Sequence, residues 1–217
     1  MNGSHDPAAS KIMQSAPPID ARDGALIQIV DAAMAEAARR SGPWLVCRVG
    51  CTECCIGPFP INQLDARRLR RGLAELNTRD AARAGLVRER ARQYVARIAH
   101  DFPGDPLNGI LAEGEAAEAQ FATFAEDEPC PALDPETGAC DLYTARPITC
   151  RTFGPPVRAG AEAVGVCELC FHGATDTEIA ACEVESDPDG VESALLSEFE
   201  ETTSARGHTI VAFCLAS

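Results

Sequence analysis

Eight of the eleven cysteines in this chain form one ordered series. Four stand close together as C-x3-C-x2-C-C and four follow at wider intervals: Cys47, Cys51, Cys54, Cys55, Cys130, Cys140, Cys150 and Cys167. Thiolate is a soft ligand that favours zinc, iron–sulfur clusters or Cu(I) over magnesium and calcium. So many thiols at such tight spacing indicate either a metal centre or a set of disulfides.

The expected compartment favours the metal centre. The N-terminus lacks the basic start and apolar stretch of a secretory signal, and no apolar run approaches the ~20 residues of a membrane helix. We therefore expect a cytoplasmic protein without a membrane partner. Clustered cysteines in a reducing compartment are more often metal ligands than disulfides. An odd number of cysteines also rules out complete pairing, although a disulfide-stapled domain stays open as an alternative.

The spacing of the cysteines bears on which metal they bind. Cys-x2-Cys occurs at Cys51/Cys54 and at Cys167/Cys170, and two such knuckles far apart in sequence are the zinc-ribbon arrangement. The side chains of neighbouring residues such as Cys54 and Cys55 point in different directions. They do not easily share one mononuclear tetrahedral site, and they suit a polynuclear cluster better. We therefore favour an iron–sulfur cluster over zinc, by a narrow margin.

Eight thiolates suffice for two four-sulfur sites, or for one polynuclear cluster and one zinc. If the first block is helical, its four cysteines share one side and form a thiolate surface that the second block closes. Four thiolates around Zn²⁺ or a 2+ cubane leave about two excess negative charges, which nearby cations and N–H donors offset. Arg146 and Arg151 are candidates for this role, with Tyr143 beside them. The alternative is that both are ordinary surface arginines.

The charge distribution excludes one class of partner. The net charge of −14 argues against nucleic-acid binding, which needs a basic footprint. Residues 62–100 nevertheless carry ten arginines against four acids, and residues 176–201 carry ten acids and no base. We interpret the arginines as a solvated helical face. A docking surface for an acidic partner, or for the acidic segment of this chain, is the alternative.

Apolar periodicity predicts a mainly helical chain. The expected helices span 23–40, with Asp23 as its cap, then 62–76, 79–99, a weaker 108–124, and 189–205. The β-branched and aromatic residues near the C-terminus predict a short strand at 208–217. Asp134–Gly138 reads as a turn that makes Cys130 and Cys140 the arms of a small hairpin.

These elements predict a mainly α fold with an irregular, Cys-rich metal-binding lobe that contains short β-hairpin elements. Residues 1–20 are expected to be a disordered tail, and residues 21–217 a single metal-binding domain. Residues 62–124 form a helical insert between the two cysteine blocks.

The cysteine pattern resembles the YkgJ-type cysteine-cluster family, described as zinc- or iron-chelating domains or as iron–sulfur-cluster-containing proteins. The resemblance rests on C-x3-C-x2-CC and on CP-x-L…G-x-C-x-L-Y-x2-RP-x2-CR-x-F-G, followed by a last cysteine. The matching residues are Cys47, Cys51, Cys54, Cys55, Cys130, Cys140, Tyr143, Arg146, Pro147, Cys150, Arg151, Phe153 and Cys167. It implies metal binding through those eight cysteines, and it leaves Cys170, Cys182 and Cys214 outside the pattern.

Three functions follow as hypotheses. The first is a metalloprotein that holds an iron–sulfur cluster or zinc in a redox, structural or metal-handling role. The second is a cluster-dependent enzyme, either an oxidoreductase or a protein-modifying enzyme. Methyl transfer is included, because a flagellin lysine-N-methylase resembles the family in its cysteines. The third is the disulfide-stapled domain. No protein partner is identified.

Overall fold

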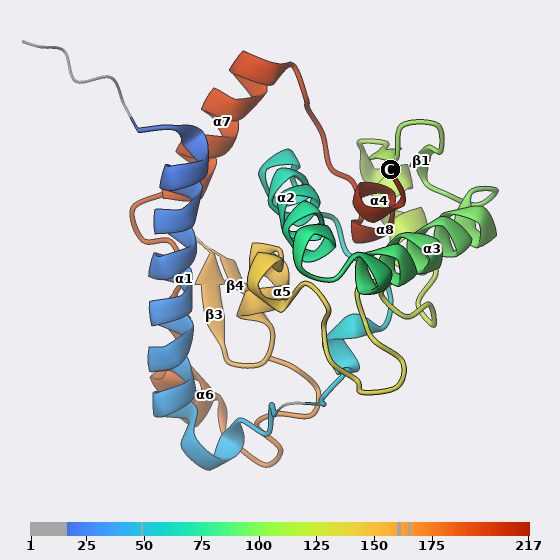
Figure 1. Ribbon diagram of the computed structural model, residues 1–217. Helices are drawn as coiled ribbons and strands as arrows, with labels where there is room; N and C mark the ends of the chain where they lie inside the picture. Colours follow the sequence, from blue (N-terminus) through green and yellow to red (C-terminus); the bar gives the residue numbers. More distant parts are fainter. Residues whose placement is uncertain (1–16, 49, 160–161, 165) are drawn as a thin grey trace, which may run out of the picture.

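A computed structural model describes residues 17–48, 50–159, 162–164 and 166–217. The predicted tail falls mostly on residues 1–16, which lie outside the described residues. The described chain is mainly helical, with short strands in small sheets and a Cys-rich loop region, as the sequence predicts (Figure 1). The α-helices are α1 Ile19–Ser41, α2 Gln63–Arg79, α3 Ala81–Ile98, α4 Glu115–Phe121, α5 Ile148–Thr152, α6 Asp176–Cys182, α7 Val191–Thr203 and α8 Val211–Ala216.

Shorter elements lie in the connections. The 3₁₀ turns are η1 Gly42–Trp44, η2 Glu53–Cys55 and η3 Tyr143–Ala145. The strands are β1 Gly104–Asp105, β2 Ile110–Leu111, β3 Val157–Ala159, β4 Glu162–Val164 and β5 Val184–Glu185. Strands β1 and β2 pair antiparallel, whereas β3 lies between antiparallel β4 and parallel β5.

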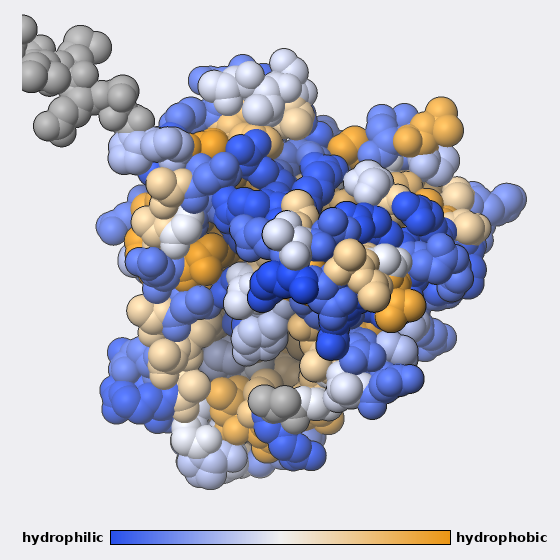
Figure 2. Space-filling view, viewed as in Figure 1, coloured by the Kyte–Doolittle hydropathy of each residue, from blue (hydrophilic) through white to orange (hydrophobic). Residues whose placement is uncertain are grey.

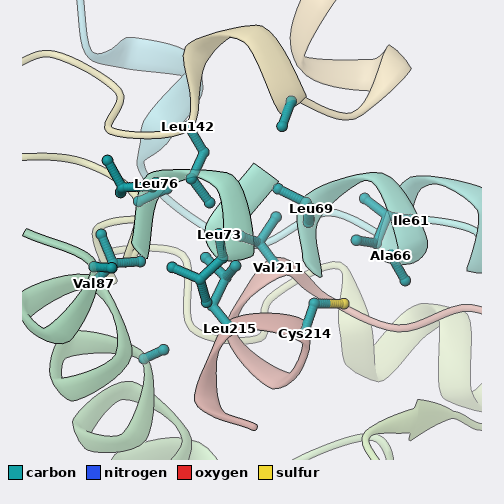
Figure 3. Packing of buried hydrophobic residues seen from close by; sticks show 14 residues of the cluster. Ile61, Ala66, Leu69, Leu73, Leu76, Val87, Leu142, Val211, Cys214 and Leu215 are labelled. Carbon is teal, nitrogen blue, oxygen red and sulfur yellow. The ribbon is translucent and has the colours of Figure 1, made fainter. Parts of the chain in front are cut away.

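Helices α2, α3 and α8 build the main core. Leu69, Leu73 and Leu76 of α2 point into it and meet Val211 and Leu215 of α8 (Figure 3). The predicted helices 62–76 and 79–99 are confirmed. Side chains cap both of them, because Asn62 accepts from the Asp65 N–H and Asp80 accepts from the Arg83 N–H.

The predicted C-terminal strand is wrong. Residues 211–216 form helix α8, and the extended pairing in this region is a single bridge between Ile61 and Thr209. A short apolar run does not separate a buried helix from a buried strand by composition. Here the helix satisfies its own backbone hydrogen bonds while its side chains fill the space between α2 and α3.

Helix α1 begins four residues earlier than the sequence predicts, at Ile19, and Asp23 is not its cap. Asp23 is buried, and its carboxylate binds Arg68 of α2 at 2.5 Å. The predicted end is confirmed, because the helix stops at Gly42, whose φ is +48°, before Pro43. An apolar face of α1 packs on α7 and α5 through Leu26 and Val30.

Two further helix predictions have different outcomes. The helix predicted at 189–205 is confirmed as α7. The one predicted at 108–124 is only partly correct, because residues 110–111 form β2 and the helix α4 starts at Glu115. Gly109 and Gly114 have φ angles of +72° and +101°, which interrupt a right-handed helix. Among the described residues no helix is long and apolar enough to cross a membrane.

Arginines of the predicted basic stretch bind acids of other segments rather than the acidic segment 176–201. Figure 2 shows hydrophilic colours over α2 and α3, where this stretch lies in Figure 1. Arg67 binds Asp20 at 2.7 Å, and Arg97 binds Glu128 at 2.6 Å. These pairs hold the α1 and loop segments against α2 and α3.

Candidate metal centre

Nine of the eleven cysteines, all free thiols, fall into two groups in the cysteine-rich lobe. We call Cys54, Cys55, Cys130, Cys140 and Cys150 the central thiol group. We call Cys47, Cys51, Cys167 and Cys170 the outer thiol group. Within each group, the negative charge of one thiolate raises the pKa of other thiols of the same group.

Cys182 and Cys214 belong to neither group. The Cys182 thiol donates to the Arg40 carbonyl at 3.4 Å. Cys214 is 1% exposed and lies among the apolar side chains of the main core (Figure 3). Both are therefore buried packing residues.

Backbone pairing brings the first cysteine block to the second. The Cys130 N–H donates to the Cys55 carbonyl at 2.7 Å, and Ile56 bridges Pro129 on the next rung. In Figure 1 the cyan η2 turn lies beside the yellow loop that follows α4. Backbone pairing alone therefore makes neighbours of Cys55 and Cys130, which are far apart in the sequence.

The turn at Asp134–Gly138 forms the hairpin that the sequence predicts. Leu133 pairs with Cys140, the Asp134 N–H donates to the Ala139 carbonyl at 2.8 Å, and the Asp141 N–H donates to the Ala132 carbonyl at 2.8 Å. Asp134 also accepts from the Thr137 hydroxyl, which closes the turn. The hairpin carries Cys130 and Cys140 on its two arms.

Helix α3 holds this hairpin from the side. The Asp141 carboxylate is 1% exposed and receives the guanidinium groups of both Arg83 and Arg90. Arg90 also donates to the Pro131 carbonyl at 2.9 Å. A buried carboxylate shared by two arginines fixes the position of the residue next to Cys140.

Helix α5 places the fifth thiol of the central group, Cys150. The Ile148 N–H at the start of α5 donates to Asp65 of α2 at 3.1 Å. Arg151 binds Asp31 of α1 at 2.7 Å and donates to the carbonyls of Thr144 and Arg146. Arg151 thus holds α5 and the preceding loop in place, and its described partners are oxygen atoms rather than thiols.

Arg146 supplies positive charge to the central group. Its charge acts on Cys54, Cys140 and Cys150. The guanidinium lies 3.6 Å from the centre of the Tyr143 ring, and its Nε donates to the Tyr143 carbonyl at 2.9 Å. Tyr143 is 60% exposed, so this stacked pair lies at the surface beside the thiols.

Four of the five thiols of the central group are poor acids, and Cys54 is the exception. Burial raises the pKa of Cys130 to about 12 and also raises the pKa of Cys140 and Cys150, to which neighbouring thiols add. A hydrogen bond with Cys55 lowers the pKa of Cys54 to about 6, with help from Arg146. A bound cation would favour the deprotonated form of these thiols, because metal ligands lose their protons on binding.

The outer group forms where the segment after η1 meets the loop before α6. The Sγ atoms of Cys47 and Cys170 lie 3.9 Å apart. Burial, together with the charges of Cys170, Cys167 and Cys51, raises the pKa of Cys47 to about 12. Cys170 is 4% exposed. The family pattern does not include it, although the spacing Cys167-x2-Cys170 is typical of a metal-binding knuckle.

The expectation of a single helical thiolate surface at residues 47–55 is wrong. The described residues there form turns, with 3₁₀ geometry at Glu53–Cys55 alone. Cys51 raises the pKa of Cys47, whereas Cys54 raises the pKa of Cys130, Cys140 and Cys150, so the two cysteines of the expected Cys51/Cys54 knuckle act on different thiols. Gly50 and Gly57 have φ angles of +87° and +78°, which a right-handed helix does not accommodate.

The donor set suits a thiophilic metal, although the described side chains are not yet arranged around one. No three His, Cys, Asp or Glu side chains of the described residues already meet at metal-binding distances. Rotation about χ1 moves a thiol sulfur without moving the backbone. Metal ligands must also lose their protons on binding, so thiolate sites commonly complete themselves only with the metal.

A separate surface groove of about 590 Å³ lies between the β1–β2 hairpin and α4. Its lining includes Phe102, Asp105 and Gln120 and contains no cysteine. This groove is therefore not part of either thiol group.

Comparison with known proteins agrees with the geometry. No curated protein and no solved structure matched the sequence. A family model named CxxCxxCC, with the description "Putative zinc- or iron-chelating domain", matches residues 46–171. The matched segment is more than half of the chain. It contains all nine cysteines of the two thiol groups and excludes Cys182 and Cys214. The chain therefore belongs to the CxxCxxCC family of metal-chelating cysteine-cluster domains.

Proposed function

We propose that the central thiol group binds an iron–sulfur cluster, with zinc as the alternative metal, in a redox, structural or metal-handling role. The observation that carries this proposal is the convergence of five thiols from three separate segments beside the charge of Arg146. Grouping thiols that repel one another when ionised costs stability, and a bound cation compensates for that cost.

The number and placement of the thiols favour iron over zinc. A mononuclear zinc site uses four ligands, and neighbouring residues such as Cys54 and Cys55 do not easily reach one ion together. A polynuclear cluster offers several metal atoms, so adjacent cysteines can bind different ones. Cys54, Cys130 and Cys140 all raise the pKa of Cys55, which supports a role for both adjacent thiols at one cluster.

The test is a metal and acid-labile sulfide analysis, with a visible spectrum, of the full chain purified without oxygen. We expect iron, sulfide and a broad absorbance near ~400 nm that reducing agent bleaches. Cys130→Ser and Cys140→Ser should lose this absorbance, whereas Cys214→Ser, which changes a buried thiol of the main core, should keep it.

Two other outcomes of the metal measurement would contradict the iron assignment. Colourless protein with bound zinc would replace the iron assignment with a zinc centre. Protein without metal, whose thiols are oxidised in pairs, would overturn the proposal in favour of a disulfide-stapled domain. Dithiothreitol would then unfold the chain, whereas a chelator would leave it folded. The groove beside α4 has no cysteine in its lining, so it lends no support to a cluster-dependent enzyme.

A further inference from the structure

The outer thiol group has the features of a site of its own. Its four members come from two cysteine pairs, Cys47-x3-Cys51 and Cys167-x2-Cys170. We propose that these four cysteines form a second metal site, separate from the central group, that takes one tetrahedral Zn²⁺ with Cys170 as a ligand. This proposal adds to the function proposed above and does not require the central group to hold iron.

The distance between sulfurs fits one shared ion. The Sγ atoms of Cys47 and Cys170 lie 3.9 Å apart. Two thiolates on one tetrahedral Zn²⁺, each about 2.3 Å from the metal, are roughly 3.8 Å apart. Thiolates that bind different irons of a cluster lie farther from one another, and a disulfide would need the two sulfurs at about 2.05 Å.

Backbone hydrogen bonds shape each cysteine pair and join the two segments that carry them. The Cys51 N–H donates to the Arg48 carbonyl at 3.0 Å, and the Cys170 N–H donates to the Cys167 carbonyl at 2.8 Å, so each pair ends in a tight turn. The Phe171 N–H then donates to the Trp44 carbonyl at 3.0 Å.

Aromatic packing closes one side of this region. The rings of Trp44 and Phe171 stack with centres 6.5 Å apart and planes 15° apart. Cys170 lies in the same buried cluster, together with Leu45 and Cys167. Because burial in this apolar shell disfavours charge, Zn²⁺ would stabilise the site by reducing the charge of four thiolates from about −4 to about −2.

The close approach of Gly154 to Cys47 also supports the proposed outer metal site. Its φ is +114°, and its carbonyl accepts from the Cys167 N–H at 3.3 Å. A Cβ at this position would lie 2.8 Å from the Cys47 sulfur and 3.2 Å from a Leu45 methyl group. The chain therefore passes the thiol at a distance that only glycine allows.

The first experiment maps cysteine protection in the full chain. The protein is loaded with Zn²⁺ in the absence of oxygen, alkylated before and after removal of zinc by a chelator, and analysed by mass spectrometry. Cys47, Cys51, Cys167 and Cys170 should be protected with zinc and become reactive together when it is removed. Buried Cys182 and Cys214 are the internal controls, because their reactivity should not change with zinc.

A second experiment counts metal ions. Cys170→Ser should bind about one Zn²⁺ fewer per chain than the unchanged protein, while Cys182→Ser, which alters a thiol of similar burial, should bind the same amount. Gly154→Ala should also lose this ion. Gly173→Ala is its matched control, because Gly173 has a φ of +78° but no atom within 4 Å of the added Cβ.

The outcomes separate the two proposals. If the chain binds metal, but Cys170 reacts identically with and without zinc and Cys170→Ser keeps the full count, the second site is overturned and the central site stands. A disulfide between Cys47 and Cys170 in anaerobically purified protein would also overturn it. If the outer four cysteines respond to zinc, but anaerobically purified protein holds neither an iron–sulfur cluster nor zinc at the central five, the function proposed above fails instead.

Discussion

At the scale of single residues, the positive charge of Arg146 opposes the negative charge of the central thiols. Its guanidinium stacks on Tyr143, and its charge acts on Cys54, Cys140 and Cys150. Side chains that support metal ligands in this way typically change metal affinity by roughly 10- to 100-fold when removed.

We therefore expect Arg146→Gln to lose metal to a chelator roughly 10- to 100-fold more readily than the unchanged protein. Protons and metal compete for the thiols, so the pH at which half of the metal is bound should move upward in the variant. The measurement is metal retention against a fixed chelator concentration across pH. Arg92→Gln on the exposed surface of α3 is the control, and equal losses in both variants would contradict the role of Arg146.

Cys214 gives a second prediction at the residue scale. Burial raises its pKa from a usual 9.0 to about 11. The folded chain therefore keeps a proton that the unfolded chain releases, so this contribution is complete below pH 9 and is lost as pH rises towards 11. The loss amounts to about 2–3 kcal/mol.

The measurement is the free energy of unfolding by urea at pH 8, 10 and 11 with reductant present. Cys214→Ala should lower stability at pH 8, because it leaves a cavity in the core. Its stability should then decline less between pH 8 and pH 11 than that of the unchanged protein. Parallel declines would show that this thiol is not the titrating group.

At the scale of elements, Arg68 joins α1 to α2 and, indirectly, to α5. Its guanidinium is 3% exposed and binds Asp23 of α1 and Asp65 of α2. Asp65 also accepts from the Ile148 N–H, which starts the helix that carries Cys150. The buried ion pairs and the thiol group are therefore parts of one connected arrangement.

Arg68→Met should destabilise the protein by about 3–5 kcal/mol, because it leaves two buried carboxylates without their partner. The midpoint and slope of urea unfolding measure this effect. Arg92→Met, at a side chain that is 57% exposed, should stay within about 0.5 kcal/mol of the unchanged protein. A small effect at Arg68 would mean that the carboxylates are protonated or reach water.

Gly72 marks the closest approach of α2 to the loop after the hairpin. A Cβ added there would lie 2.3 Å from the Cβ of Ala145. Gly85 of α3 has no atom within 4 Å of an added Cβ, so the two helical glycines form a matched pair.

Gly72→Ala should cost about 1–3 kcal/mol through overpacking, although alanine is the better helix former. Gly85→Ala should instead stabilise the protein by about 0.5–1 kcal/mol, since it gains helix propensity without a clash. Thermal unfolding of both variants measures these changes in stability relative to the unchanged protein. If both substitutions stabilise, α2 and η3 are farther apart than the structure indicates.

At the scale of the whole molecule, we expect bound metal to stabilise mainly the cysteine-rich lobe and hydrophobic packing to stabilise mainly the helical core. Helices α2, α3 and α8 enclose a continuous apolar core. The cysteine segments are joined mostly by turns and isolated bridges, and Ala132, Leu142 and Ala145 fasten the second segment to this core. Removal of metal should therefore loosen the lobe before the core.

Hydrogen exchange of the full chain before and after anaerobic chelation tests this expectation. Protection should fall in residues 50–57, 130–150 and 166–171 and should persist in α2, α3 and α8. The unchanged core serves as the internal control. Uniform loss across the chain would instead show that the metal is required for the whole fold.

The local sequence was sufficient to predict the helices in which apolar residues recur at helical spacing. The stripe through Leu69, Leu73 and Leu76 predicts α2, and Asp134–Gly138 predicts its turn from residue chemistry alone. The helix start at Ile19 was missed, because Asp23 resembles a cap in sequence but serves as the buried partner of Arg68. Long-range ion pairs of this kind have no local signature.

By itself the sequence determined that the protein is mainly helical and that it carries a cysteine pattern typical of domains that bind zinc or iron, because periodicity and ligand chemistry are properties of short segments. Only the tertiary structure divided the thiols into a central and an outer group and brought Cys170 into the second. The spacing between Cys51 and Cys54 does not encode the direction in which each side chain points. That direction follows from where the chain pairs with Pro129 and Cys130, and from the segments that approach Trp44 and Gly154.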